Sequence, residues 1–338
     1  MSWERIRGHA DVIETLRRSY TGGRLGHAYL FVGPEGIGKR LVARELAKAV
    51  LCERPPRPLT ACDSCPSCVQ VRADTHPDFL TLSTPAGKHE LPVEAMRDFC
   101  RQLARKPLRG TRRVGVVEDA DDLNPESANS FLKTLEEPPP GTLLVLIATS
   151  TDRQLPTILS RCQVVRFSPL SIADVTAVLA AAGIDDEARR ARLGRLSAGS
   201  VARALALDDP AVWKLREELV TGLTDPRPNF SRLAETWEQF LLDAGKDTSA
   251  QRSRASAVIA FLLDALRAAL RLALGATVFG LDPDEEDRLR AFADRVGVER
   301  LLELIEYCVE ADHRVERRVQ LVLVIESVLE QFTQARQG

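Results

Sequence analysis

Apolar runs alternate with amphipathic stretches through the first 168 residues of the chain. Three of these runs, HAYLFVG, VGVVED and LLVLIATS, have the length and composition of buried β-strands. The segments between them place apolar residues with the period of an α-helix. This alternation is typical of a parallel β-sheet covered by helices. We therefore expect an α/β domain over residues 1–168.

The pattern changes after residue 168, where strand-like runs give way to helical periodicity. A short alanine-rich unit occupies residues 172–207, and longer helices extend from residue 211 to the end. Helix-breaking residues cluster near Pro169 and again at residues 208–210. These breaks predict a small helical domain over residues 169–208 and an all-helical domain over residues 209–338.

Composition and charge narrow the classes of protein that fit. The chain is 44% hydrophobic and 28% charged, which is ordinary for a globular protein. A formal net charge of -2 argues against binding nucleic acid over the whole surface, so such binding would need a local patch or a partner. No apolar run approaches the roughly 18 to 20 residues of a membrane helix. The charged N-terminus lacks the apolar core of a signal peptide, so we expect a cytoplasmic protein without membrane contacts.

The stretch GPEGIGKR follows the first strand-like run and precedes a helical pattern, which is the setting of a phosphate-binding loop. The candidate nucleotide-binding residues are Gly33, Pro34, Glu35, Gly36, Ile37, Gly38, Lys39 and Arg40. Loop amides at the start of a helix would face a phosphate, and Lys39 would neutralise it. Arg40 stands where a serine or threonine hydroxyl normally binds Mg²⁺. ATP binding therefore stays open, efficient hydrolysis is not expected, and a simple glycine-rich turn is the alternative.

Two acids, Glu118 and Asp119, close the second strand-like run. Hydrolysing phosphate-loop enzymes place acids here, usually aspartate first to hold the metal and glutamate second to position the attacking water. The order is inverted in this chain, so each carboxylate is displaced by one methylene from the position its role requires. The alternative is a solvated acidic turn after a buried strand.

Four of the seven cysteines follow the spacing C-x9-C-x2-C-x2-C. Four thiolates so close in sequence suit a tetrahedral structural Zn²⁺. The predicted ligands are Cys52, Cys62, Cys65 and Cys68. An iron-sulfur cluster and unliganded thiols are the alternatives, although the downstream cysteine of a typical cluster run is missing. The isolated Cys100, Cys162 and Cys308 are expected to pack in the core.

Several motifs together resemble the clamp-loader branch of the AAA+ proteins. They are GRLGHAYLFVGPEGIGK, the four-cysteine insert followed by HPDF, NSFLKTLEEPP, and LPTILSRCQVVRF. The resemblance covers residues 1 to about 207 and continues more weakly into RRVQLVLVIESVLEQF, which is similar to the last collar helix of that branch. It implies an AAA+ domain, a helical lid and a helical collar that joins five subunits into a ring. Such rings open a sliding clamp and close it on primed DNA with ATP held between neighbouring subunits.

The resemblance also implies roles for individual residues. Arg161, within Ser160-Arg161-Cys162, falls on the motif whose arginine reaches into the adjacent subunit's ATP site. Such an arginine stabilises charge on the transferring phosphate, although Arg161 taken alone would be a surface ion-pair partner. Thr149 falls on the nucleotide-sensing position. Ala202 occupies the lid position where the hydrolysing subunit carries arginine, and Arg203 lies about 100° around the helix from it.

Arg40, the inverted acids and Ala202 alter three parts of a hydrolytic site, whereas Arg161 is intact. We therefore expect a replication subunit with weak or absent ATPase activity that completes a neighbour's ATP site during clamp loading. Its expected partners are the other ring subunits and, through the complex, the sliding clamp and primed DNA. The alternatives are the ATP-hydrolysing motor subunit and an AAA+ interaction module outside replication. The basic stretch at residues 103–113 is either a DNA contact or a solvated loop.

Overall fold

The computed structural model describes residues 2–85, 88, 90–245, 248–278, 281, 283–317 and 319–334. Two compact units make up the chain. The first contains Met1–Val178 and Gly199–Val201, and the second contains Leu179–Ala198 and Ala202–Gly338. The three-domain division at residues 168 and 208 stays a prediction, and residues 335–338 of its last domain lie outside the described residues.

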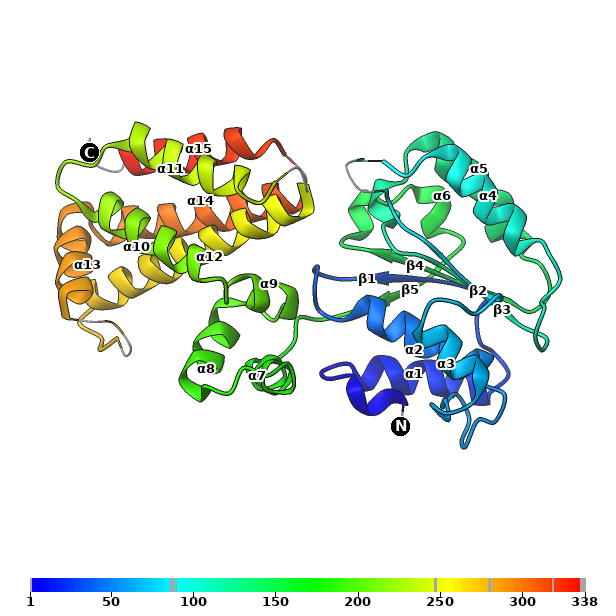
Figure 1. Ribbon diagram of the computed structural model, residues 1–338. Helices are drawn as coiled ribbons and strands as arrows, with labels where there is room; N and C mark the ends of the chain where they lie inside the picture. Colours follow the sequence, from blue (N-terminus) through cyan, green and yellow to red (C-terminus); the bar gives the residue numbers. More distant parts are fainter. Residues whose placement is uncertain are drawn as a thin grey trace. The chain divides into compact units, whose positions relative to one another are not determined.

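The first unit is built on a five-stranded sheet with the strand order β2-β3-β4-β1-β5 (Figure 1). The strands are β1 (Ala28–Val32), β2 (Phe79–Leu82), β3 (Arg113–Val117), β4 (Thr142–Ala148) and β5 (Gln163–Arg166). Every neighbouring pair is parallel. The predicted α/β class with a parallel sheet is therefore confirmed.

Helices cover both faces of this sheet. They are α1 (Ala10–Thr21), α2 (Lys39–Leu51), α3 (Pro66–Arg72), α4 (Val93–Leu103), α5 (Pro125–Glu136) and α6 (Pro156–Leu159), with short 3₁₀ turns at Ser2–Arg5, Ala120–Asp122 and Thr151–Arg153. Side chains alternate along β1, so Tyr29 and Phe31 join the core with α1 and α2, whereas Leu30 joins the core with α4 and α5. All five residues of β1 are buried, which explains its uninterrupted apolar sequence.

The parallel strands bring distant loops to one edge of the sheet. β4 pairs with β1 on one side and with β3 on the other. The segments that follow these three strands therefore lie next to one another, although they come from widely separated parts of the sequence. They carry the phosphate loop, the acids Glu118 and Asp119, and Thr149.

The remaining elements are helices. They are α7 (Ile172–Ala181), α8 (Glu187–Leu196), α9 (Val201–Ala206), α10 (Pro210–Thr224), α11 (Phe230–Leu242), α12 (Thr248–Ala273), α13 (Pro283–Val296), α14 (Val298–Glu316) and α15 (Leu321–Gln334). In the second unit α12 packs against α10, α13 and α14, and α15 packs against α11 and α14. The expected helical C-terminal region is confirmed. Among the described helices, none combines the length and apolarity that crossing a bilayer requires.

Candidate functional site

The phosphate loop joins the end of β1 to the first turn of α2. Gly36 and Gly38 have φ angles of 74° and 105°, which strain any residue with a Cβ atom. A Cβ on Gly33 would lie 2.4 Å from the carbonyl oxygen of Phe167. The shape of the loop therefore requires all three glycines.

Lys39 points back onto its own loop. Its side chain is buried, and Nζ donates hydrogen bonds to the carbonyl oxygen of Gly33 and, at 2.5 Å, to that of Pro34. Binding a phosphate through Lys39 would require the ammonium to exchange these carbonyl partners for phosphate oxygens. The loop residues thus fit a phosphate, but they stabilise one another in this conformation.

Two further carbonyl groups of the loop have partners from elsewhere in the first unit. His9 Nε2 donates to the Ile37 carbonyl oxygen at 2.7 Å, and the Val201 amide donates to the Gly36 carbonyl oxygen at 3.0 Å. The His9 ring also lies edge-on to Phe167, with 4.9 Å between centroids. Sequence reasoning did not identify His9. The sequence around Val201 gives no indication that its backbone contacts the loop.

Arg40 joins the loop to both acids after β3. Its Nη2 lies 2.6 Å from Asp119 Oδ1, and its Nε lies 3.6 Å from Glu118 Oε2. The Thr84 amide donates to the other Asp119 oxygen at 3.0 Å. The structure therefore brings the predicted loop and acidic residues together, with the guanidinium of Arg40 as the cation between them. This arrangement fits an internal ion pair, with Arg40 at the position where a Mg²⁺-binding hydroxyl is expected.

Thr149 follows β4 at the same edge of the sheet. Its amide donates to Asp121 Oδ2 at 2.7 Å, and Gln154 Nε2 donates to Asp121 Oδ1 at 3.0 Å. Asp121 thus fixes the backbone at Thr149. Sequence reasoning did not single out Asp121, because several acids follow β3 and none is distinguished by its spacing.

Arg203 is engaged within the second unit. Its Nη1 lies 2.6 Å from Asp312 Oδ2, and its Nη2 donates to the Ser256 carbonyl oxygen at 3.0 Å. Ala202, at the preceding position of α9, offers only a methyl group. The Arg203 guanidinium therefore has two partners within the second unit.

Arg161 lies just after α6, where the chain turns into β5. Its Nε donates to Glu136 Oε1 at 2.8 Å, and its Nη2 donates to the same oxygen. Its Nη1 donates to the Thr157 carbonyl oxygen and to Ser160 Oγ, each at 2.9 Å. The side chain is 30% exposed. The guanidinium is therefore held at the surface in a defined orientation.

The position of Arg161 on the sheet separates it from its own phosphate loop. Arg161 precedes Gln163, the first residue of β5, and Gln163 pairs with Tyr29 near the amino end of β1. The phosphate loop starts after Val32, at the carboxyl end of β1. Because the strands are parallel, Arg161 lies near the amino ends of the strands and the phosphate loop near their carboxyl ends. The two groups are separated by roughly 10 Å along the strand direction.

The four predicted metal ligands come together in the insert between α2 and α3. The Sγ atoms of Cys52, Cys62, Cys65 and Cys68 all lie within 4.8 Å of one another. The Cys62 and Cys68 sulfurs are 3.9 Å apart, close to the edge of about 3.8 Å expected for a tetrahedron with Zn–S bonds of about 2.3 Å. The donor set and its geometry therefore fit a metal ion such as Zn²⁺.

Backbone amides surround the sulfur atoms. The amide of Cys62 donates to Cys52 Sγ at 3.3 Å, that of Cys65 to Cys62 Sγ at 3.3 Å, and that of Cys68 to Cys65 Sγ at 3.4 Å. A hydrogen bond from the Ser64 backbone lowers the pKa of Cys62 to about 6, whereas burial raises the pKa of Cys52 and of Cys68. A bound cation would therefore have to drive the deprotonation of the buried thiols. Among the other cysteines, Cys162 and Cys308 are buried and Cys100 is partly buried.

The basic stretch at residues 103–113 contains one arginine that is neither solvated nor available to DNA. The Arg113 guanidinium lies 2.8 Å from Asp78 Oδ1 and donates to the carbonyl oxygens of Gln102 and Lys106. The side chains of Arg113 and Asp78 are 4% and 0% exposed. For Arg113, both the DNA-contact and the solvated-loop interpretations are therefore wrong, because this residue anchors the loop.

Comparison with known proteins places these residues in a family. Residues 8–171 match the family described as "DNA polymerase III, delta subunit". The chain is 37% identical over 231 residues to DNA polymerase III subunit delta' of Pseudomonas aeruginosa, an alignment that covers 66% of this chain and 70% of the relative. The chain belongs to the DNA polymerase III delta' family.

The chain is also similar to other proteins. The delta' subunit of Escherichia coli is 36% identical over 217 residues, which is 64% of each chain. The tau subunit of Escherichia coli is 33% identical over 211 residues, covering 61% of this chain and 32% of tau. A DNA polymerase III gamma subunit-related protein from Thermotoga maritima is similar over 96% of this chain and 99% of its own, with 17% identity and a TM-score of 0.42.

Proposed function

We propose that this delta'-family chain is a clamp-loader subunit of DNA polymerase III that completes the ATP site of a neighbouring motor subunit. Arg161 would act as the arginine finger of that site. Loading of the sliding clamp on primed DNA would then depend on this chain, although it hydrolyses little ATP itself. The observation that carries the proposal is that Arg161 lies near the amino ends of the strands, whereas the phosphate loop of the same chain lies at their carboxyl ends.

The residues around the chain's own loop support weak or absent hydrolysis. The Arg40 guanidinium pairs with Glu118 and Asp119. It therefore neutralises the carboxylates that would hold Mg²⁺ in an active enzyme. The glycines and Lys39 fit a phosphate group, but the residues present do not fit a Mg²⁺ site. Hydrolysis by this loop is therefore not part of the proposed mechanism.

The contacts of Arg161 support an action on another subunit. Its partners Glu136, Thr157 and Ser160 hold the side chain near the amino ends of the strands, where it is partly exposed. A positioned guanidinium can stabilise the charge that develops on a transferring phosphoryl group, and such fingers can be worth roughly 10³ to 10⁵ in rate. A nucleotide held by an adjacent subunit could contact Arg161 on this side of the sheet. A nucleotide bound to the chain's own phosphate loop could not.

The proposed partners follow from the family and its relatives. They are gamma or tau subunits and the delta subunit, arranged with this chain in a five-subunit ring around primed DNA. The helices from α10 onward, in residues 209–338, would form the collar that joins the ring, and the sliding clamp would be contacted through the assembled complex. Zn²⁺ held by the four cysteines would contribute a structural cross-link between the end of α2 and the start of α3.

Reconstitution tests this function. The purified chain is mixed with a motor subunit from the same organism that carries intact nucleotide motifs, together with delta, the clamp and primed DNA. We expect a stable complex that loads the clamp only when this chain is present. Failure to enter the complex would favour an AAA+ interaction module outside replication. Strong ATP hydrolysis by the chain alone would instead favour a gamma- or tau-type motor.

A further inference from the structure

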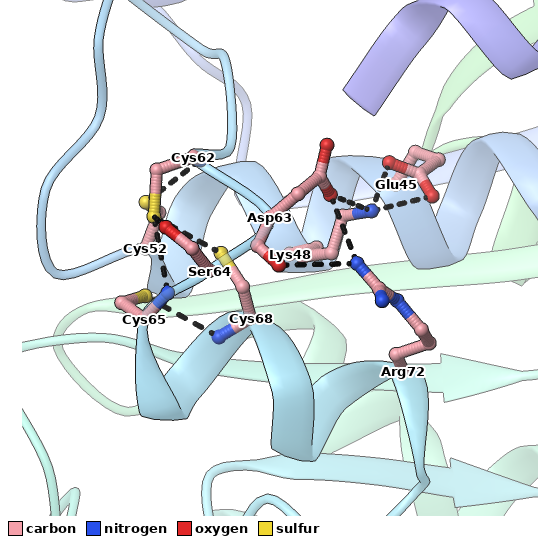
Figure 2. A network of polar contacts seen from close by, with 9 residues as sticks. All are labelled: Glu45, Lys48, Cys52, Cys62, Asp63, Ser64, Cys65, Cys68 and Arg72. Carbon is pink, nitrogen blue, oxygen red and sulfur yellow. Dashed lines mark hydrogen bonds and ion pairs between the residues drawn. The ribbon is translucent and has the colours of Figure 1, made fainter. Parts of the chain in front are cut away.

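A buried lysine connects the phosphate-loop helix to the metal-binding insert. Lys48 lies on the third turn of α2, the helix that begins at Lys39 and is followed directly by the metal ligand Cys52. Its side chain is 2% exposed. Nζ lies 2.7 Å from Glu45 Oε2 on the same helix and 2.6 Å from Asp63 Oδ1 in the insert (Figure 2). A buried lysine needs a nearby negative charge, and these two carboxylates supply it.

Asp63 occupies the turn that presents two of the metal ligands. It directly follows Cys62, and its φ angle of 64° places it in the left-handed region that non-glycine residues seldom occupy. Aspartate tolerates this conformation better than most residues, and contacts around the turn hold it in place. The ion pair with Lys48 supplies one of these contacts, and it comes from outside the insert.

A second cation holds the same turn from α3. Arg72 Nη2 donates to the Asp63 carbonyl oxygen at 3.2 Å and lies 3.4 Å from its Oδ1. Figure 2 shows the two cations approaching Asp63 beside the cysteine cluster. The Arg72 side chain is 45% exposed, whereas that of Lys48 is buried, so the Lys48 contact is the one sheltered from solvent screening.

We propose that Lys48 is a positioning residue of the metal centre. Through Asp63 it holds the turn between Cys62 and Cys65 in the conformation that binds metal, without touching a ligand sulfur itself. Residues behind the ligands of a metal site commonly change its affinity by roughly 10- to 100-fold when they are replaced. The affinity of the insert for Zn²⁺ is therefore set in part by a side chain on the phosphate-loop helix.

Competition for zinc between the full-length chain and a chromophoric chelator tests this role. Lys48→Met should weaken zinc binding by roughly 10- to 100-fold, while saturating zinc still gives the wild-type stoichiometry. Lys48→Arg keeps a cation and should recover most of the affinity. The matched control is Lys133→Met, which removes an exposed lysine from α5 and should bind zinc like the wild type.

Two further measurements separate positioning from a general loss of stability. Asp63→Asn alters the partly exposed partner, so it should fold even if Lys48→Met does not, and it should weaken zinc binding similarly. Combining it with Lys48→Met should add little, because both changes remove the same contact. In thermal unfolding, Lys48→Met should lower the Tm by more in the presence of zinc than in its absence. Zinc competition curves that coincide for Asp63→Asn, Lys48→Met and the control would overturn the proposal, as would a wild-type chain that binds no zinc.

Discussion

Arg40 Nη2 and Asp119 Oδ1 are 79 positions apart in the sequence and 2.6 Å apart in space. This ion pair links the first turn of α2 to the end of β3, the two segments between which phosphate-loop enzymes hold Mg²⁺. The Arg40 side chain is 58% exposed, so the pair contributes little to folding stability. Its larger effect is on chemistry, because the carboxylates already have a cation that cannot coordinate a phosphate and a water as a metal does.

The isolated chain should therefore hydrolyse ATP at or near the background rate. Lys39→Ala should leave this rate unchanged, because the loop is not expected to turn over. Phosphate release is the measurement, made with the purified chain alone and with Mg²⁺ in excess. Robust turnover that Lys39→Ala abolishes would contradict this expectation and would identify the loop as catalytic.

Arg161→Ala should impair the neighbouring subunit rather than this one. We expect an intact fold and normal entry into the reconstituted complex, because the side chain is partly exposed and its ion pair with Glu136 lies at the surface. Hydrolysis stimulated by clamp and DNA should fall by orders of magnitude at the one affected site. Total turnover should fall only partly, since the other sites still work, and clamp loading should fall further.

Lys39→Ala in the same complex is the matched control for Arg161→Ala. It changes the phosphate loop of this chain and should reduce clamp loading much less. A severe defect from Lys39→Ala beside a silent Arg161→Ala would mean that the roles of the two residues are reversed.

The purified chain should contain about one zinc per molecule. Cys65→Ser should release it, because Cys65 Sγ is one of the four clustered sulfurs and the substitution removes this thiolate ligand. Elemental analysis checks the metal, and limited proteolysis should find new cleavage confined to the insert while circular dichroism keeps the helical signal. Iron in place of zinc, or no metal after preparation under reducing conditions, would rule out this assignment.

Arg113→Met should lower the free energy of unfolding by about 3 to 5 kcal/mol, because it leaves the buried Asp78 carboxylate without its cation. Urea unfolding at pH 7 measures the loss. Arg97→Met is the control, since Arg97 is 62% exposed and 3.9 Å from Glu94. That change should stay within about 0.5 kcal/mol of the wild type. If the two substitutions lowered the free energy of unfolding equally, the buried Arg113–Asp78 pair would contribute no more stability than the exposed pair.

The effect of Arg113→Met should also depend on pH. Burial raises the pKa of Asp78, but hydrogen bonds from the Leu108 amide, the Arg113 side chain and the Arg109 amide outweigh it and lower the pKa below its usual value. A lowered folded-state pKa stabilises the fold above the unfolded pKa of about 3.9. This contribution is lost as the pH falls through the folded pKa. The difference between wild type and Arg113→Met should therefore be full at pH 7 and shrink progressively below about pH 4.

The sequence predicted the central strands and missed the edges. β1, β3 and β4 are buried along their whole length, so they read as continuous apolar runs. β2 and β5 are the two edge strands, have four residues each and are partly exposed. Their apolar signal is therefore too short and too mixed to stand out from the surrounding loops.

The same physical distinction applies to the site. The cysteine cluster was predictable because its ligands are close in sequence. The phosphate loop and the acids Glu118 and Asp119 could be expected at the same side of the sheet, because both follow strands of one parallel sheet, but their ion pair with Arg40 was not foreseen. The contact of His9 with the phosphate loop and the burial of Arg113 were not predictable, because each depends on a single long-range partner. Nothing in the basic stretch at residues 103–113 indicates that Arg113 pairs with the buried Asp78.

The position of β1 between β4 and β5 has a consequence for how the chain is synthesised and folds. Ala28 pairs with Leu144 and Tyr29 pairs with Gln163, so both neighbours of β1 are synthesised long after it. On the ribosome, β2 and β3 can pair before β4 exists, whereas the strand AYLFV must wait without a sheet. Such late, non-local pairing slows folding and leaves apolar segments open to aggregation. We therefore expect nascent chains that end before β4 to be bound by chaperones, and the phosphate loop to take shape only after β4 and β5 have been translated.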